Sequence, residues 1–308
     1  MTQTNTDNLR TVYERPLVVF GSEGFIGKHL VALQTAHGPA VGIDHARGQQ
    51  ADSIANRLRR IPQSPVVIHA AGSVSKTGLP NQETYLKSTI DLFQAVAAVQ
   101  PSATVVTLGS VIEQLDTRTP YALIKRQQRA LACQAAEKLG IHWIHMLLHN
   151  PVGPGQAQTQ VAGAIARRLL MTISQSQPLL RIRHSGAVRD WMDVRDVCRV
   201  ILAVTEKCKP TNRHPIDRQQ QVEVCTGNGQ SVWALANALV SASGADIMLV
   251  DDAATPTQHT AASDTRTVVG DPTNLRQLIG SAAAPRHSLT RSMRDLWHTL
   301  LVTEGPRV

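Results

Sequence analysis

Five short apolar runs alternate with longer amphipathic stretches through the first half of the chain. The apolar runs are residues 17–20, 40–43, 66–69, 104–108 and 141–148. They are rich in Val, Ile and Leu and mostly too short for a helix, which is typical of strands buried on both faces. Apolar residues recur at helical spacing within residues 28–36, 53–60, 81–99 and 121–139. This alternation predicts an α/β fold, a doubly wound parallel sheet of Rossmann type with helices on both faces.

The first apolar run ends in three glycines, Gly21, Gly24 and Gly27, and a helical pattern follows at once. A strand that turns through glycines into a helix leaves backbone N–H groups at the helix N-terminus, where a pyrophosphate is favoured. Glycine suits this turn because a Cβ would keep the phosphates away from the backbone. The spacing therefore predicts a dinucleotide site. The alternative is that the glycines serve only the close packing of helix on strand.

The second apolar run ends at Asp44. A carboxylate about twenty positions after the glycines can accept hydrogen bonds from the adenosine ribose and would repel a 2′-phosphate. Asp44 therefore favours NAD(H) as the cofactor. Arg47 lies close enough to receive a 2′-phosphate, so NADP(H) stays possible.

Ser110, Tyr121 and Lys125 are the residues that could carry chemistry. Tyr121 and Lys125 are four residues apart, so on a helix they project from one face. An ammonium beside a phenol favours the phenolate, which would let Tyr121 exchange a proton with a carbonyl or alcohol. Ser110 follows an apolar run, at the sheet edge where doubly wound folds bind ligands, and could polarise a substrate oxygen. The alternatives are an ordinary helical pair and a turn cap.

The net charge is +8, but the basic residues are spread over several predicted elements and aromatic residues make up only 3%. Nucleic-acid surfaces usually couple positive charge to stacking residues or a recognition helix, so we expect no nucleic-acid partner. The charge instead suits a phosphorylated small molecule. No apolar run is long enough to span a membrane, and residues 1–15 lack the apolar core of a signal peptide.

Four cysteines are scattered without a CxxC pair, and the 12 histidines lack the spacing of a zinc site. We therefore expect free thiols, no disulfide framework, no metal and a cytoplasmic location.

In these motifs the chain resembles the extended short-chain dehydrogenase/reductase family, which contains NAD(P)-dependent nucleotide-sugar epimerases, dehydratases and reductases. The resemblance covers nearly the whole chain. Further matching segments are Ile68-His69-Ala70-Ala71-Gly72, Leu108-Gly109-Ser110, Asn150-Pro151-Val152-Gly153-Pro154-Gly155-Gln156 and Arg189-Asp190-Trp191-Met192-Asp193.

The resemblance implies roles for individual residues. Catalysis would fall to Ser110, Tyr121 and Lys125, and substrate binding to Ser110, Asn150 and Arg189. Cofactor contacts would come from Tyr121 and Lys125 and from Gly21, Gly24, Phe25, Ile26, Gly27, Asp44, His69, Ala70 and Ala71.

Within that family, residues 225–232 and 270–276 are similar to GDP-4-keto-6-deoxymannose reductases and related 4-ketoreductases. The chain also departs from the common pattern. The segment between Ser110 and Tyr121 is short, Leu147 and Ala261 stand where many members carry an arginine, and Val111-Ile112 replaces the Asp-Glu pair of dehydratases. The last departure argues against dehydration.

The leading hypothesis is NAD(P)H-dependent reduction of a keto group, the 4-keto group of a 6-deoxy nucleotide sugar. The alternatives are a nucleotide-sugar 4-epimerase, a ketoreductase for a non-nucleotide intermediate, and a non-catalytic NAD(P)-sensing protein. Residues 1–150, with 187–226 returning, would form the cofactor domain. Residues 151–186 and 227–308 would form a smaller substrate-binding lobe, and the polar stretch 209–221 has the composition of a linker. Apolar positions in the helices near 81–99 and 121–139 suggest a homodimer.

Overall fold

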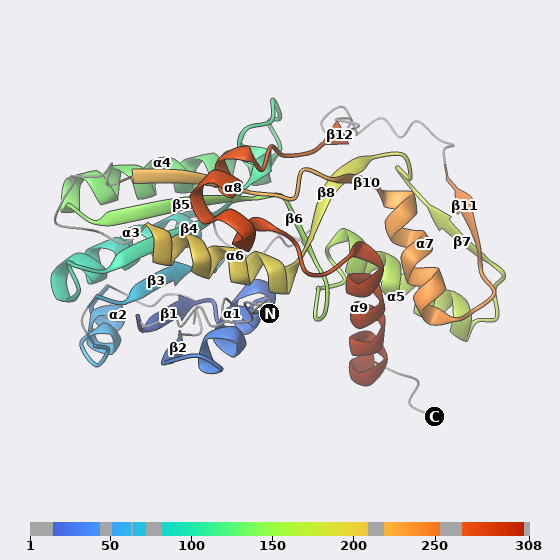
Figure 1. Cartoon of the computed structure of the whole chain (residues 1–308), viewed down its shortest axis with the longest axis horizontal. Coiled ribbons are helices and arrows are strands. Elements are labelled where there is room, and N and C mark those ends of the chain that lie inside the picture. Colours follow the sequence, from blue (N-terminus) through green and yellow to red (C-terminus); the bar gives the residue numbers. More distant parts are fainter. Residues whose placement is uncertain are drawn as a thin grey trace, which may run out of the picture.

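The computed structural model of this protein describes residues 15–43, 51–62, 64–71, 82–208, 219–252 and 267–304. Two lobes lie side by side along the longest axis of the molecule, as Figure 1 shows. The larger lobe contains the main parallel sheet, and the smaller one combines short strands with three helices.

The main sheet has six parallel strands in the order β2-β1-β3-β4-β5-β9. Side chains of β1 alternate between two cores, Leu17 and Val19 on one face and Val18 and Phe20 on the other. This burial on both faces confirms the predicted doubly wound α/β sheet. The strands are β1 (Leu17–Phe20), β2 (Ala40–Ile43), β3 (Val66–His69), β4 (Thr104–Ser110), β5 (His142–Leu148) and β9 (Gln219–Val224).

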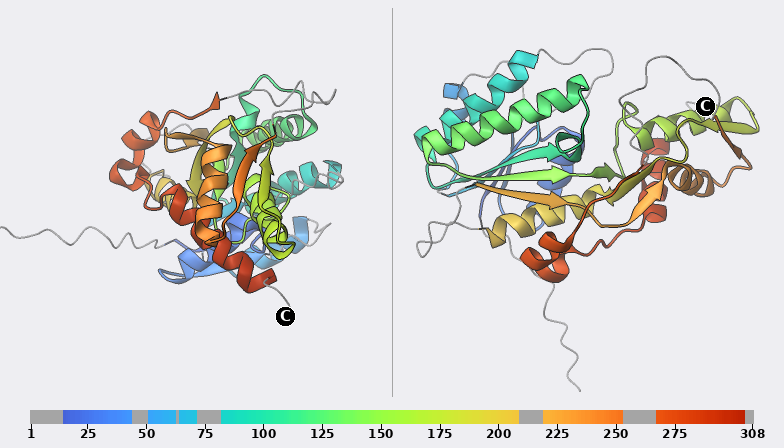
Figure 2. Two further views of the ribbon diagram at one scale, coloured as in Figure 1. Left: turned by 90° about the vertical axis from the view of Figure 1, so that its right-hand side faces the viewer. Right: turned by 90° about the horizontal axis from the view of Figure 1, so that it is seen from above.

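Helices cover both faces of this sheet, as the view from above in Figure 2 makes clear. One face carries α1 (Phe25–Thr35) and α6 (Val194–Lys207), which bury Leu30 and Val197 against the strands. The other carries α2 (Ala51–Leu58), α3 (Gln82–Val99) and α4 (Pro120–Leu139), which bury Ile54, Phe93 and Ala132.

Three boundaries differ from the sequence-based expectation. Helix α1 begins at Phe25, directly after the glycine turn, and β4 continues to Ser110 because its last residues still pair with β5. The polar stretch 209–221 was expected to be a linker, but Gln219 already pairs with Trp143 in β9. A polar strand is possible there because β9 forms the edge of the sheet, where only alternate residues such as Val222 and Val224 are buried. Residues 209–218 lie outside the described part.

The smaller lobe has its own core, in which Leu169, Leu235, Met293 and Trp297 are buried. Its strands form a four-stranded sheet and a parallel pair. The sheet contains β6 (Asn150–Val152), β8 (Val188–Asp193), β10 (Gly229–Ser231) and β12 (Thr267–Val268), and the pair is β7 (Leu179–Ile182) with β11 (Met248–Asp251). The helices are α5 (Val161–Ser174), α7 (Val232–Ser243) and α9 (Leu289–Glu304).

Buried acids of β8 fasten the two lobes. Asp193 accepts hydrogen bonds from Arg195 at the start of α6 and from Ser292 Oγ of α9, the latter at 2.6 Å. Burial acts to raise the pKa of Asp193, but these hydrogen bonds outweigh it and lower that pKa from its ordinary value. Asp190 accepts from the backbone N–H groups of Thr226 and Gly227. These contacts fix the chain where it crosses between lobes.

After residue 150 the chain passes back and forth between the two lobes, so each later segment is assigned to the lobe on which it packs. Strand β8 belongs to the smaller sheet, whereas α6 and β9 belong with the larger one. Helix α8 (Thr273–Ile279) and the short helix Gly280–Ala283 also pack on the larger lobe, because Leu275 and Ala283 join its core. We therefore propose that the cofactor domain ends near residue 150, as the sequence predicts. We also propose that residues 273–283 return to that domain. No helix in the described ranges is long and apolar enough to cross a bilayer.

Candidate active site

A cavity of about 400 Å³ opens where the larger lobe meets the smaller one. It lies beyond the carboxyl ends of β3, β4 and β5, the edge at which open parallel sheets bind ligands. Both lobes contribute to its walls. The lining residues that the sequence had singled out are Phe25, Ile26, Ala70, Ala71, Ser110, Tyr121, Lys125 and Asn150.

The glycine turn has the form that a phosphate-binding loop requires. Gly21 has a φ of +82°, and a Cβ at Gly27 would lie 2.0 Å from the Gly21 carbonyl oxygen, so neither position tolerates a side chain. Gly24 is the N-cap of α1. Among the described residues, no side chain caps the N-terminus of α1, and its first turn contains no acidic residue. The first N–H groups of α1 are thus suited to a diphosphate, and this loop fits a dinucleotide.

Lys125 is buried and fully hydrogen-bonded. Its Nζ donates to Tyr85 Oη at 3.0 Å, to the Leu108 carbonyl at 3.0 Å and to Gln128 Oε1 at 3.1 Å. An ammonium has three protons, so all of them are used. The sequence predicts that Lys125 lies beside Tyr121 and contacts the cofactor, at a ribose. A ribose contact would require one of these three acceptors to be exchanged.

The charge state of Lys125 follows from its surroundings. Burial alone would lower its pKa, but the electrostatic interactions with Tyr85 and Tyr121 and the hydrogen bond with Tyr85 raise that pKa above the ordinary 10.5. Lys125 is therefore an ammonium at neutral pH. Its positive charge acts on Tyr121, which is half-buried in the wall of the same cavity.

Ser110 lies in the cavity wall and also caps a helical turn. Its Oγ accepts from the Ile112 N–H at 3.4 Å, and its own N–H donates to Glu113 Oε1 at 2.8 Å. Together they form a capping box around the short 3₁₀ helix Val111–Glu113. The turn-cap interpretation of Ser110 is thus correct, and the same cap fixes the backbone from which its hydroxyl projects.

A buried network supports Glu113. Its Oε2 lies 3.0 Å from His145 Nε2, and His145 Nδ1 lies 2.8 Å from Thr107 Oγ1, which accepts from Trp143 Nε1 at 2.9 Å. These bonds are all satisfied if His145 carries its proton on Nε2 and donates it to Glu113. The network joins β4 and β5 to the turn after Ser110.

The short segment between Ser110 and Tyr121 is also held from α4. The Arg126 guanidinium donates to the carbonyls of Glu113, Leu115 and Thr117. One side chain, next to Lys125 in the sequence, thus binds most of this segment. These contacts and the hydrogen bond from the Ser110 N–H to Glu113 hold the short segment in place.

We expect Glu113→Ala to lower the free energy of unfolding by about 1–3 kcal/mol, because the Ser110 N–H and His145 would lose a buried partner. Urea denaturation measures this change. The control is Glu137→Ala, at an exposed position of the same helix α4 as Lys125. Equal stability of the two variants would contradict a supporting role for Glu113.

Not all sequence-predicted residues meet in the cavity. The three glycines lie in the turn behind Phe25, and His69 is buried edge-to-face against Tyr85, with ring centroids 6.4 Å apart. Arg189 is half-buried on β8, where it donates to the Val188 carbonyl and where burial lowers its pKa. Arg189 is not among the described residues that line the cavity. Asp44, Arg47 and Ala261 lie outside the described residues.

Other residues of the cavity escaped the sequence analysis. Tyr85 reaches it from α3, and no motif marks a tyrosine in a helix as a partner of Lys125. On the side of the smaller lobe, Thr159, Gln160, Val161 and Ala164 line the cavity without belonging to any motif, whereas Trp191 lies in one of the matching segments. Among described residues, His149, Glu223 and Cys225 also bring metal-binding side chains together, although their spacing along the chain gave no signal.

Comparison with known proteins agrees with this geometry. The sequence matches the NAD dependent epimerase/dehydratase family over residues 17–216. It is 26% identical over 266 residues to the GDP-6-deoxy-D-mannose reductase of Pseudomonas aeruginosa, covering 77% of this chain and 83% of that protein.

Solved structures show the same fold. RMD from Pseudomonas aeruginosa, complexed with NADPH, superimposes with a TM-score of 0.75 at 23% identity, over 96% of this chain and 100% of that one. UDP-glucuronic acid 4-epimerase from Bacillus cereus, in complex with UDP-glucuronic acid and NAD, gives 0.73 at 17% identity over 94% and 99%. UDP-glucose 4-epimerase from Thermus thermophilus, with NAD, gives 0.68 at 19% identity over 92% and 98%.

The glycine turn, the tyrosine and lysine in one cavity, and the family match over most of the chain agree with one another. This protein belongs to the NAD-dependent epimerase/dehydratase family and is an NAD(P)-dependent oxidoreductase of the extended short-chain dehydrogenase/reductase type.

Proposed function

We propose that this protein reduces a keto group of a nucleotide sugar, the 4-keto group of a 6-deoxy hexose. The observation that carries the proposal is that Ser110, Tyr121 and Lys125 line one cavity, next to the turn suited to a dinucleotide. The similarity to a GDP-6-deoxy-D-mannose reductase supports the substrate class. Val111 and Ile112 in place of paired acids favour reduction over dehydration.

Each residue would have a distinct part in the reduction. The nicotinamide, when bound, supplies a hydride to the carbonyl carbon of the substrate. The Ser110 hydroxyl donates a hydrogen bond to the carbonyl oxygen and orients it. Tyr121 gives its phenolic proton to that oxygen as negative charge develops there, and the Lys125 ammonium stabilises the phenolate that remains. The product is the secondary alcohol.

Residues at the smaller lobe would bind the rest of the substrate. Asn150 lies in the cavity wall where β6 begins, and its Nδ2 donates to the Asp190 carbonyl at 3.4 Å. We propose that Asn150 and Arg189 recognise the diphosphate-bearing part. Arg189 supplies positive charge on β8, and Trp191, two residues on, lines the cavity.

Turnover experiments test the proposed reaction directly. Purified protein is mixed with GDP-4-keto-6-deoxymannose and NADH or NADPH, and oxidation of the cofactor is followed by the loss of the near-ultraviolet absorbance of the reduced nicotinamide. We expect stoichiometric oxidation and formation of the 6-deoxy sugar. Interconversion of UDP-hexoses with a retained, non-exchanging NAD would instead identify a 4-epimerase. Oxidation with simple ketones only would identify a non-nucleotide ketoreductase, and no turnover of any kind a sensing protein.

We further propose NAD(H) as the preferred cofactor, because Asp44 follows the strand β2 that pairs with β1 beside the glycine turn. Asp44→Ala should weaken NADH binding by about 1–3 kcal/mol, the cost of leaving the ribose hydroxyls without their partner. Fluorescence titration of NADH and NADPH measures the effect. Much tighter binding of NADPH than NADH by the unmodified protein would contradict the preference and direct attention to Arg47.

We also propose a homodimer through α3 and α4, which pack side by side on one face of the sheet (Figure 2). Leu123 on α4 is 45% exposed, and Leu86, Ile90 and Leu131 keep part of their surface accessible. Leu123→Glu should shift the dimer to a monomer in light scattering. Met248→Glu, at an exposed position of the smaller lobe, is the control and should stay dimeric. A monomer in the unmodified protein would refute the proposal.

A further inference from the structure

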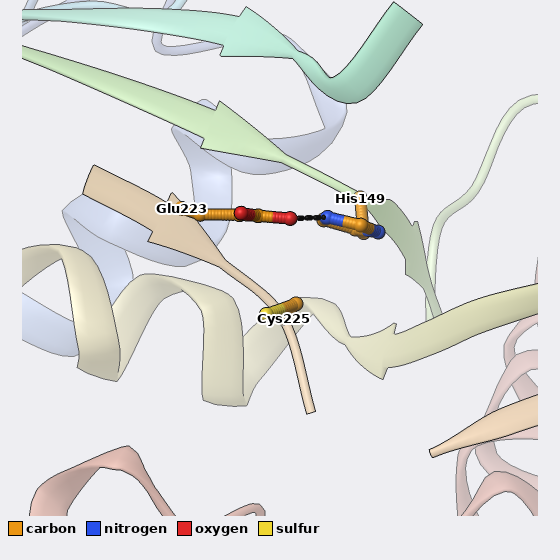
Figure 3. Close-up of side chains that lie close together, drawn as sticks. All are labelled: His149, Glu223 and Cys225. Atoms are coloured by element: carbon orange, nitrogen blue, oxygen red, sulfur yellow. Dashed lines mark hydrogen bonds and ion pairs between the residues drawn. The ribbon is translucent and has the colours of Figure 1, made fainter. Parts of the chain in front are cut away.

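Three side chains of metal-binding type meet beside the cavity, where β5 and β9 end, and one of them, His149, also lines that cavity. Figure 3 shows His149 just past β5 with its ring edge toward Glu223 of β9, and Cys225 just past the end of β9. The pairing of Leu148 with Val224 in parallel register brings these flanking residues together. One ligand atom from each lies within 4.8 Å of the other two.

Two of the three donors are buried and the third is partly exposed, so a cation could reach the cluster from the side of the exposed one. The His149 side chain is 1% exposed and Cys225 is 0% exposed, whereas the Glu223 side chain is 28% exposed. Glu223 Oε1 lies 2.5 Å from His149 Nε2. Since ligand atoms around a tetrahedral Zn²⁺ lie more than about 3 Å apart, this carboxylate must move outward to admit a cation, and its exposure allows that movement.

Gly270 packs closely against two of the donors. A Cβ at Gly270 would lie 2.5 Å from Cys225 Sγ and 2.6 Å from His149 Nε2, so only glycine fits beside them. No side chain at this position therefore covers the two donor atoms.

A divalent cation that binds here would displace the proton of the Cys225 thiol, because the thiolate is the form that coordinates a metal.

We propose that His149 Nε2, a Glu223 carboxylate oxygen and Cys225 Sγ form a binding site for a borderline divalent cation, Zn²⁺ or Co²⁺. Mixed nitrogen, oxygen and sulfur donors select such ions, whereas Mg²⁺ and Ca²⁺ require oxygen ligands. With three protein donors, the fourth tetrahedral position is open to water. The cation would join the ends of β5 and β9 at the wall of the proposed catalytic cavity.

Cobalt titration of the full chain tests this site, because Co²⁺ bound to a thiolate gives a charge-transfer absorption and a tetrahedral visible spectrum. We expect one Co²⁺ per chain, displaced by Zn²⁺ and unaffected by Mg²⁺. Cys225→Ser should abolish the charge-transfer band, and Glu223→Gln should weaken Co²⁺ binding at least about tenfold, or 1.4 kcal/mol. Cys208→Ser, which replaces another buried thiol at the end of α6, should leave both unchanged.

The two variants keep the test decisive even if one of them folds poorly. Glu223→Gln changes one partly exposed atom and should retain the unmodified circular dichroism spectrum and cofactor binding. The proposal is overturned if Co²⁺ gives no thiolate band with the unmodified protein, or if Glu223→Gln and Cys225→Ser bind Co²⁺ as tightly as it does. Cofactor oxidation with a keto substrate is measured separately, so failure of the metal site leaves the proposed reduction unaffected.

Discussion

Tyr121→Phe should lower kcat about 10²–10⁴-fold, which is the usual contribution of proton transfer by a positioned side chain. The substitution removes one oxygen and keeps the ring in the cavity wall, so cofactor affinity and thermal stability should change little. Single-turnover oxidation of bound NADH by the keto substrate, in stopped flow, gives the chemical step directly. Titration of NADH then shows that the loss lies in catalysis.

Tyr85→Phe is the matched control, since Tyr85 lines the same cavity and also lies near the Lys125 ammonium. Its hydroxyl donates to Gln128 and accepts from Lys125, so its removal should lower the free energy of unfolding by about 1 kcal/mol. We expect it to retain much more activity than Tyr121→Phe. Equal single-turnover rates in the unmodified protein and Tyr121→Phe would remove Tyr121 from the mechanism.

Gly24→Val should abolish cofactor binding while the fold stays intact. The backbone at Gly24 has a φ of −73°, which valine adopts, and the nearest atom to an added Cβ is the Gly21 carbonyl oxygen at 3.1 Å. The side chain would therefore fit the protein with a small adjustment. It would project from the N-cap of α1 into the space that a diphosphate needs.

Titration of NADH, followed by protein fluorescence, measures this loss, and circular dichroism verifies the fold. Gly186→Val is the control, because an added Cβ there meets nothing within 4 Å and the residue is exposed on the smaller lobe. Cofactor affinity in Gly24→Val within about threefold of the unmodified protein, or less than about 1 kcal/mol, would show that the diphosphate binds elsewhere.

The sequence by itself determined the parallel sheet, its helices and the cofactor turn. These features depend on local patterns, namely apolar runs of strand length, helical spacing and glycines at a strand end. The assignment of Ser110, Tyr121 and Lys125 to one edge of the sheet also succeeded, because the carboxyl ends of parallel strands necessarily lie together. The roles of these residues remain predictions for the experiments above.

Tertiary structure decided which side chains surround those residues. The pairing of Lys125 with Tyr85, of Glu113 with His145 and of His149 with Glu223 joins positions 40, 32 and 74 residues apart. No local pattern encodes such contacts, because they arise from strand register and from helices packed across a sheet. Burial then forces each polar group to find a partner, and the available partner depends on the whole fold. The same reason explains why the first three residues of β9, 219–221, resemble a linker in the sequence. Their pairing with β5, rather than their own hydrophobicity, holds them in the sheet.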